Sequence, residues 1–454
     1  MALSASSVLQ VRTDGSDTNG GGFVTGATGT DWSQQAAAQY AVTDAVTNGS
    51  TTITSATANF GTDVVGNLLY IAGGTGAITG AWYQIMTRSS ATTITVDRST
   101  GLTTGTGATL NIGGAFLTLA AMLAIMTVSG MTAYVKAGSG YTIGTGLTTS
   151  SSPSLGSHQN VIGYTNTLTD GGRVTITASA GITMLTCAGS GWKWSNFIFD
   201  ANNVASTNGV NLSGTWSNHL WNCIVKNCKG YGVTVGGQGS GIDNCEVTGC
   251  ATGTAAVVLA EFASVLNCAI HDNTIPGISA GSNSATVQAS LIYNNTGASS
   301  DGIIFTGGGA HSGKFIGNTI YGNGRDGLRL ATYPASIVSG NIFVGNGGYG
   351  FNSASLSPAR DNPMNHHNAF YNNTSGARNN ASAGPGDVTL TGDPFTNAAG
   401  GDFSLNSTAG AGAAARAAAF PGALIAGGTG YRDAGALQHL DAGGMLYVPN
   451  LEGT

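Results

Sequence analysis

A seven-residue pattern of alternating polar and apolar positions recurs between residues 196 and 373. Successive copies start 22 to 28 residues apart, which gives a drifting period near 24 residues. Such a period is typical of solenoid proteins, in which each unit buries its apolar face only by stacking on its neighbours. The copies are Asn196–Asn202, Asn222–Cys228, Asn244–Cys250, Asn267–Asn273, Ala289–Asn295, Gly317–Asn323, Gly340–Asn346 and His367–Asn373.

Alignment of the copies predicts which side chains point inward. The fourth position is always large and apolar, and the second position, two residues earlier, shares its face of the strand. We therefore expect both positions to point into one core, with the second changing from apolar to amide side chains along the stack. The fourth position holds Phe199, Val225, Val247, Ile270, Ile292, Ile320, Phe343 and Phe370, and the second holds Phe197, Cys223, Cys245, Cys268, Ser290, Asn318, Asn341 and Asn368.

The seventh position of the repeat is asparagine in six of the eight copies and cysteine in the other two. Side-chain amides stacked from coil to coil can bond to one another and satisfy the backbone of a bend, and Asn tolerates left-handed geometry. We therefore predict a structural ladder at a turn. Its members are Asn202, Cys228, Cys250, Asn273, Asn295, Asn323, Asn346 and Asn373.

The chain before the repeats differs from the rest. Residues 1–110 contain short β-type runs separated by Gly, Ser and Thr, which predicts a small all-β N-terminal module for attachment or assembly. The runs are Thr51–Ile53, Leu68–Ile71, Trp82–Met86 and Thr92–Val96.

Residues 111–130 are predicted to form a helix that caps the stack, because the end coil of a solenoid would otherwise expose its core and unpaired strand edges. Phe116, Leu119, Ala120 and Leu123 lie at helical spacing there. We expect a parallel β-helix over residues 131–385 and a C-terminal coil and tail over residues 386–454, so the fold class is all-β.

Composition excludes several classes of protein. Charged residues make up 8% of the chain, Gly contributes 73 residues, and the net charge is −6. The basic residues are scattered, so we expect no nucleic-acid partner. The apolar stretch between Arg98 and Lys136 is interrupted by glycines and too short to cross a bilayer, and residues 1–12 lack the pattern of a secretory signal. We therefore expect no membrane span and no export by the general route.

Six cysteines occur, and none of them forms a CxxC motif or lies at ligand spacing from a histidine. We therefore expect no metal and no cofactor. Cys223, Cys245 and Cys268 share one position of the repeat, and Cys228 and Cys250 share another, so stacked coils place them within disulfide range of each other. In a reducing cytoplasm, free thiols are favoured over disulfides.

The repeats resemble the pectate-lyase-like right-handed parallel β-helix superfamily over roughly residues 115–440. The C-terminal part also resembles bacterial and phage members of this superfamily, in Asp393–Phe395, Asp402–Leu405 and Tyr431–Gln438. The N-terminal module is similar to modules that precede β-helices in phage virion proteins. The resemblance implies a right-handed single-stranded β-helix. Because the superfamily includes lyases, hydrolases, epimerases, tailspikes and adhesins, it does not imply one activity.

Neither the acidic calcium cage of a pectate lyase nor the paired carboxylates of a polygalacturonase-type hydrolase is evident. The candidate residues lie on neighbouring coils, which would place them near one side of the stack. The weak catalytic candidates are Asp272, Asp301, Asp326 and Arg325, the candidate glycan-binding residues are His271, Tyr293, Tyr321 and Arg329, and Tyr349 is a further candidate stacking surface. The alternative interpretation, which we favour, is that these residues are turn-solvating charges and outward-facing aromatics.

A second candidate cluster lies near residue 366. His366 and His367 follow Arg360 and Asp361 in an insertion that contains two prolines. Because His367 opens a copy of the repeat, a role in the turn is favoured over a role in chemistry.

Three functions fit this sequence. The favoured one is a phage virion structural protein (a tailspike, fibre or capsid-decorating protein) that binds other virion proteins and a host-surface glycan, with homotrimerisation as a hypothesis and the virion as its location. The second is a polysaccharide lyase or hydrolase acting as a depolymerase. The third is a bacterial surface glycan-binding or filament protein, which would be extracellular.

Overall fold

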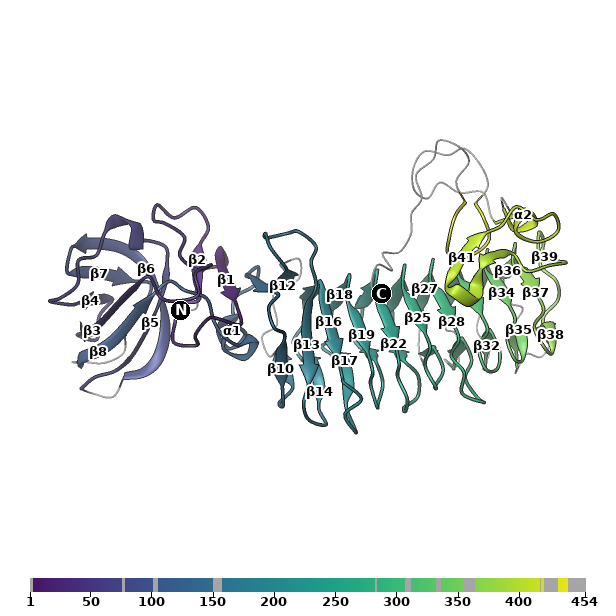
Figure 1. The fold of residues 1–454 in the computed structure, drawn as a ribbon, viewed down its shortest axis with the longest axis horizontal. Coiled ribbons are helices and arrows are strands. Elements are labelled where there is room, and N and C mark those ends of the chain that lie inside the picture. The colour runs from purple at the N-terminus through teal and green to yellow at the C-terminus, as the bar shows by residue number, and fades with distance from the viewer. Residues whose placement is uncertain are drawn as a thin grey trace. The chain divides into compact units, whose positions relative to one another are not determined.

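The computed structural model describes residues 3–75, 78–100, 105–149, 157–281, 284–306, 312–331, 336–354, 364–416, 418–419 and 432–439. These residues divide into two compact units. The first contains residues 3–142, 147–176 and 189–197, and the second contains residues 143–146, 177–188 and 198–439. Each unit is described separately, and Figure 1 labels the elements.

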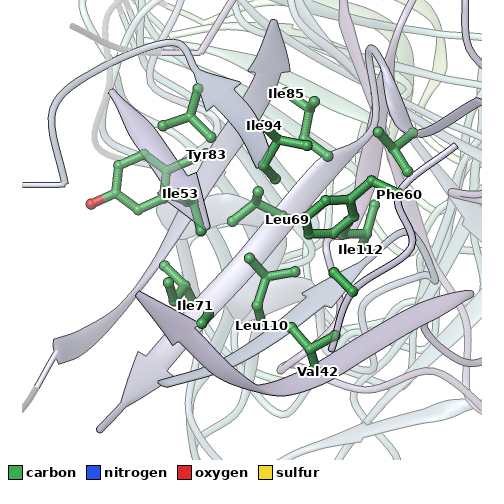
Figure 2. Packing of buried hydrophobic residues seen from close by; sticks show 14 of the residues in the cluster. Val42, Ile53, Phe60, Leu69, Ile71, Tyr83, Ile85, Ile94, Leu110 and Ile112 are labelled. Atoms are coloured by element: carbon green, nitrogen blue, oxygen red, sulfur yellow. The ribbon is translucent and has the colours of Figure 1, made fainter. Parts of the chain in front are cut away.

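The first unit contains a closed six-stranded antiparallel barrel whose strand order is β3-β4-β7-β6-β5-β8. Apolar residues at alternate positions of these strands fill its core, among them Ile53, Leu69, Ile94 and Leu110, as Figure 2 shows. All four β-type runs that the sequence indicates in this region lie in the barrel. Its strands are β3 (Tyr40–Thr47), β4 (Thr52–Thr54), β5 (Leu68–Gly73), β6 (Ile78–Ser90), β7 (Thr93–Val96) and β8 (Gly105–Ile112), with the short helix η1 (Thr62–Val64) between β4 and β5.

The first unit also contains parallel strands of the β-helix. Strand β1 (Ser7–Val11) pairs antiparallel with β2 (Gly22–Val24) and parallel with β9 (Thr132–Lys136). Strand β9 pairs with β12 (Gln159–Tyr164), and β12 pairs with β15 (Trp192–Ser195). A segment near the N-terminus thus pairs with the first coil through β1, whereas β2 forms an isolated bridge from Phe23 to Asn67 beside the barrel strand β5. The predicted domain limits at residues 110, 130 and 385 stay predictions.

The helix α1 (Leu119–Ile125) lies against β1 and β11 (Leu147–Thr149) of the first unit. Thr118 caps it, because its hydroxyl accepts a hydrogen bond from the Ala121 N–H. The buried residues are Leu119, Met122 and Met126, whereas Ala120 is exposed. Of the predicted apolar positions, Phe116 and Leu119 are buried and Leu123 is half-buried, so only the inward placement of Ala120 was wrong.

The second unit is a solenoid of three parallel sheets, as the stacked arrows from β16 to β38 show in Figure 1. We call them the A, C and D sheets, and each coil contributes one short strand to each of them in that order. The A sheet contains β18 (His219–Trp221), β21 (Gly241–Asp243), β24 (Ser264–Leu266), β27 (Thr286–Gln288), β30 (Lys314–Ile316), β33 (Ile337–Ser339) and β36 (Met364–His366).

The C sheet carries the third to fifth positions of the repeat, and the D sheet follows the seventh. The C sheet contains β16 (Phe197–Asp200), β19 (Ile224–Lys226), β22 (Glu246–Thr248), β25 (Ala269–His271), β28 (Leu291–Tyr293), β31 (Thr319–Tyr321), β34 (Ile342–Val344), β37 (Ala369–Tyr371) and β39 (Val388–Thr389). The D sheet contains β14 (Thr183–Cys187), β17 (Asn208–Leu212), β20 (Val233–Val235), β23 (Val257–Leu259), β26 (Ile278–Ala280), β29 (Ile303–Phe305), β32 (Leu328–Leu330), β35 (Tyr349–Ser353) and β38 (Gly376–Asn379). The strands β10 (Tyr141–Ile143) and β13 (Val174–Ala178) span the division between the units.

The predicted inward columns are confirmed. Every residue at the fourth position is at most 2% exposed, and every residue at the second position is at most 4% exposed. The strand register aligns Val225, Val247, Ile270, Ile292 and Ile320 directly over one another from coil to coil. The prediction of an all-β protein built on a parallel β-helix is therefore confirmed.

A buried ion pair closes the C-terminal end of the solenoid. In β38 the core position beside Phe351 is taken by Arg378, whose guanidinium lies 4.1 Å from the centre of the Phe370 ring and pairs with the buried Asp387. The Asp387 carboxylate also accepts a hydrogen bond from the backbone N–H of Asn368. The last apolar layer is thus covered by a cation whose charge is balanced.

The C-terminal segment then folds back over the outer face of the C sheet. It contains β40 (Phe395–Asn397), η2 (Ala398–Gly400), β41 (Asp402–Leu405) and α2 (Gly412–Ala415). Phe395, Phe403 and Leu405 of this segment form one buried cluster with Leu291 and Ile342 of the C sheet. The outer face of these coils is therefore a second apolar core and not a free surface.

Candidate functional site

The asparagine column between the C and D sheets is a continuous hydrogen-bonded chain. The side-chain amide of Asn273 donates to the side-chain oxygen of Asn295 over 2.8 Å, and the same bond repeats through Asn323 and Asn346 to Asn373. A second chain of this kind runs from Asn318 through Asn341 to Asn368. These buried amides satisfy backbone groups of the bends, so they hold the solenoid together and are not open to a ligand.

Two details of the predicted ladder need correction. Asn202 lies outside it, because its side chain is exposed and the buried place at that turn belongs to Ala201. The left-handed residue of the other turns is the sixth position, such as Asp272 (φ 52°) and Asn294 (φ 51°), and not the seventh. The seventh side chain can point inward because the preceding residue makes the bend.

The first group of predicted site residues surrounds His271 on the outer face of the C sheet. Its Nδ1 lies 2.8 Å from Asp272 Oδ2, and its Nε2 lies 3.3 Å from Glu246 Oε1. The ring stacks on Tyr293 with 4.6 Å between the centroids. Desolvation lowers the pKa of His271, but the two carboxylates raise it by more, so the pKa lies above its ordinary value.

The second group lies in the turns that lead into the D sheet. Asp301 is fully buried, and its carboxylate accepts two hydrogen bonds from Arg325 and one from the backbone N–H of Asp326. Asp326 accepts hydrogen bonds from the backbone N–H of Tyr349 and from the side chain of Asn352. Burial raises the pKa of Asp301, and the bonds from Arg325 oppose that rise.

The structure therefore divides the predicted constellation into two separately bonded groups. His271 and Asp272 bond to each other and to Glu246, whereas Asp301, Arg325 and Asp326 bond to one another across two coils. All the carboxylates named here are partners in these contacts, so the geometry favours a role in holding the turns.

The predicted stacking surfaces are largely covered. Tyr293 lies 4.7 Å from Phe403 between ring centroids, and Tyr321 lies 5.9 Å from Phe395 and 5.5 Å from Phe403. The interpretation of these two tyrosines as open glycan platforms was therefore wrong, because the C-terminal segment covers them. Arg329 lies on the D sheet beside Asn352 and is half-buried.

The second predicted cluster is only partly described, because Arg360 and Asp361 lie outside the described residues. The Nδ1 atoms of His366 and His367 lie 3.0 Å apart, and Ser339 Oγ lies 3.0 Å from Nδ1 of His366.

The cysteines are free and buried. The backbone N–H of Cys223 contacts the sulfur of Cys245 at 3.5 Å, and Cys245 contacts the sulfur of Cys268 at 3.4 Å in the same way. Burial and the neighbouring Cys268 raise the pKa of Cys245, so this thiol is neutral. Among the residues that the structure describes, no group of three or more His, Cys, Asp or Glu side chains could hold a metal ion. No described helix is long and apolar enough to cross a membrane.

The A sheet carries a feature that the sequence analysis missed. Trp221 in β18 is 41% exposed, and Trp216, just before β18, is 45% exposed. Asp243 of β21 is the register partner of Trp221 on the next coil, and Asn267 donates a 2.9 Å hydrogen bond to its Oδ1. Neighbouring side chains of a strand point to opposite faces, and Leu220 is buried. An inward Leu220 in the sequence could therefore have predicted that Trp221 points outward. Large aromatic side chains exposed on a rigid sheet indicate a contact surface.

Comparisons with known proteins identify the fold. The family model for the right handed beta helix region matches residues 180–299 and 236–409. The pectate lyase Pel9A is similar with a TM-score of 0.58 and 16% identity, over 72% of this chain and 92% of that chain. The A-module of mannuronan C-5 epimerase AlgE4 from Azotobacter vinelandii matches with a TM-score of 0.40 and 15% identity, over 58% of this chain and 89% of that one.

A viral protein also matches. ORF18 of Geobacillus virus E2 gives a TM-score of 0.39 and 12% identity, over 58% of this chain and 55% of that one. The search of curated proteins finds no match. At these identities the likeness concerns the fold alone.

Proposed function

This chain belongs to the right-handed β-helix family, and from that membership we propose that it is a phage virion structural protein whose rigid β-helix attaches to a host-surface glycan. The observation that carries the binding role is the exposed pair Trp216 and Trp221 on the A-sheet side of the solenoid. Sugar rings present an apolar face that packs on an indole and a rim of hydroxyls that needs polar partners. Asp243, beside Trp221, supplies such a partner.

Binding without cleavage is supported by the state of the carboxylates. Hydrolysis of a glycosidic bond needs two carboxyl groups that face the substrate, one as acid and one as base or nucleophile. Asp301 is 0% exposed and bonded to Arg325, and both oxygens of Asp326 accept hydrogen bonds within the turns. These two side chains therefore stabilise the turns of the solenoid and are not available as the acid or base of a hydrolysis.

A virion location and assembly with other virion proteins complete the proposal. It is supported by the small barrel that precedes the β-helix and by the capped end at Arg378, and it rests further on the resemblance that the sequence of this module suggests. A homotrimer is part of the proposal. A bacterial surface or filament protein, located outside the cell, is the alternative in which the same surface binds a glycan.

The test measures binding of the full chain to intact host cells and to their isolated surface polysaccharide. Trp221→Ala and Trp216→Ala should each weaken binding by about tenfold or more, because central aromatic anchors dominate such contacts. Met364→Ala is the matched control, since Met364 is 62% exposed at the other end of the same sheet. Equal binding by all three variants contradicts the proposed surface. Electron microscopy of labelled particles tests the virion location.

A depolymerase remains the second function, and the same samples test it. Release of oligosaccharides from the polysaccharide by the wild-type chain, lost in the triple variant Asp272→Asn, Asp301→Asn and Asp326→Asn, would replace the binding role with a catalytic one. Because these carboxylates stabilise turns, the triple variant must first show wild-type circular dichroism. We expect binding without product release.

A further inference from the structure

Two adjacent histidines at the end of β36 point to the same place. In an extended strand, successive side chains point to opposite faces. His367, however, has a φ of 57°, which turns the chain so that its imidazole meets that of His366. Left-handed geometry costs a residue with a Cβ roughly 1–2 kcal/mol. At the equivalent turns of the two preceding coils the chain uses Gly317 and Gly340.

The position of His367 is held from several sides. Its backbone N–H donates to the carbonyl of Pro385 over 2.9 Å. The backbone of Gly386 lies against its ring so closely that a Cβ there would come within 2.5 Å of His367 Cδ2. The backbone carbonyl of His366 accepts a hydrogen bond from Gly340 on the preceding coil. The two rings are therefore oriented by the fold before any ligand arrives.

The distance between the two Nδ1 atoms suits two ligands of one metal ion. The Nδ1 atoms lie 3.0 Å apart, and imidazole nitrogens bind first-row metals at about 2.0–2.1 Å, which gives an N–metal–N angle of about 94°. That angle suits the neighbouring positions of a square-planar or octahedral ion and is smaller than a tetrahedral ion prefers. Ser339 Oγ, 3.0 Å from Nδ1 of His366, offers an oxygen at the same place.

We propose that His366 and His367 bind a divalent first-row transition metal of tetragonal preference, Cu²⁺ or Ni²⁺, through their Nδ1 atoms, with the Ser339 hydroxyl or water completing the coordination. One of the two Nδ1 atoms carries a proton toward the other in the metal-free form, and on binding this proton moves through solvent to Nε2 of the same ring, so that both rings bind the metal as neutral imidazoles. The site is independent of the proposed glycan surface. It also runs against the expectation of no metal, which rested on ligand spacing along the sequence.

The charged and titratable groups around the site are His367, Asp387 and Arg378. Desolvation and the neighbouring His367 lower the pKa of His366, against an opposing effect of Asp387. Asp387 is itself paired with Arg378.

The test titrates the full chain with CuCl₂, NiCl₂ and ZnCl₂ by calorimetry and records the electron paramagnetic resonance of the Cu²⁺ form. We expect binding in the order Cu²⁺, Ni²⁺, Zn²⁺ and nitrogen splitting from two equivalent imidazoles. His366→Ala and His367→Asn should each weaken Cu²⁺ binding by at least about tenfold, because the second ligand of a chelate binds at high effective concentration. His367→Asn keeps a residue that tolerates left-handed geometry, so the turn should persist.

His219→Ala is the matched control, because His219 lies on the same sheet in β18 and should leave the affinity unchanged. Circular dichroism of each variant establishes that it is folded. The proposal is overturned if the wild-type chain binds no Cu²⁺, if the two site variants bind as tightly as the wild type, or if the spectrum of the Cu²⁺ form shows one nitrogen only.

Discussion

Replacement of Asn323 by alanine tests the hydrogen-bonded column at its centre. The Asn323 amide donates to the carbonyl of Ile292 over 3.1 Å and to the side chain of Asn346 over 3.0 Å. Its oxygen accepts from the backbone and the side-chain N–H groups of Asn295, over 3.2 and 2.9 Å. The side chain is 1% exposed, so water cannot readily replace these partners.

The loss can be estimated from these four bonds. Each contributes about 1 kcal/mol net, and a buried N–H group left without a partner costs about 1–3 kcal/mol. The backbone N–H of Asn295 would be such a group, since Asn323 Oδ1 is its acceptor. We expect Asn323→Ala to lower the free energy of unfolding by about 4 kcal/mol, a large effect for a single substitution.

Urea unfolding followed by far-ultraviolet circular dichroism measures the total effect, and hydrogen exchange locates it. A solenoid unfolds by neighbouring units, so protection should fall first in the turns around Asn295 and Asn323. Asn166→Ala is the control, because Asn166 is exposed in a loop and should change stability by less than about 0.5 kcal/mol. If Asn323→Ala is as stable as that control, the column does not hold the coils together.

Three further predictions concern stability. Arg325→Ala should lower the free energy of unfolding in urea by about 2–3 kcal/mol, because it leaves the buried carboxylate of Asp301 without its cationic partner. The double variant Arg325→Ala with Asp301→Asn should lose less stability than Arg325→Ala alone. Equal losses in the two variants would refute the coupling between these side chains. Ala289→Gly should raise the melting temperature and add about 0.5 kcal/mol, since Ala289 has a φ of 50°, and no gain would contradict the strain. The raised pKa of His271 means that its pairing with Glu246 stabilises the fold below the unfolded pKa of 6.5 and is lost as the pH rises through the folded pKa. His271→Gln should flatten the dependence of the melting temperature on pH in this range. An unchanged slope would show that the pairing of His271 with Glu246 does not contribute to it.

The core of the solenoid could be predicted from the sequence because its register is strictly periodic. Val225, Val247 and Ile270 occupy equivalent places in copies of one unit, and stacking leaves such side chains a single direction. The turn at Asn202 was misassigned because this coil bends one residue later than the others, which leaves Ala201 inside. Composition alone does not reveal such a shift.

The site was harder to predict because its environment comes from distant parts of the chain. Tyr293 and Tyr321 were correctly placed on the outer face of their strands, but the residues that cover them, Phe395 and Phe403, lie outside the repeats. The charges of Asp301 and Arg325 were expected on neighbouring coils, and their bidentate pairing depends on side-chain geometry that spacing does not encode.

The fold-back of the C-terminal segment has a consequence for synthesis. Phe403 leaves the ribosome 110 residues after Tyr293, which corresponds to about 5–20 s of translation. During that interval the nascent solenoid exposes the apolar outer face of Leu291 to solvent, and Ile342 joins this exposed face once it has been synthesised. The apolar outer face of the middle coils is therefore covered only after the C-terminal segment has been synthesised. A stop codon before residue 395 would leave this apolar face permanently exposed to other chains.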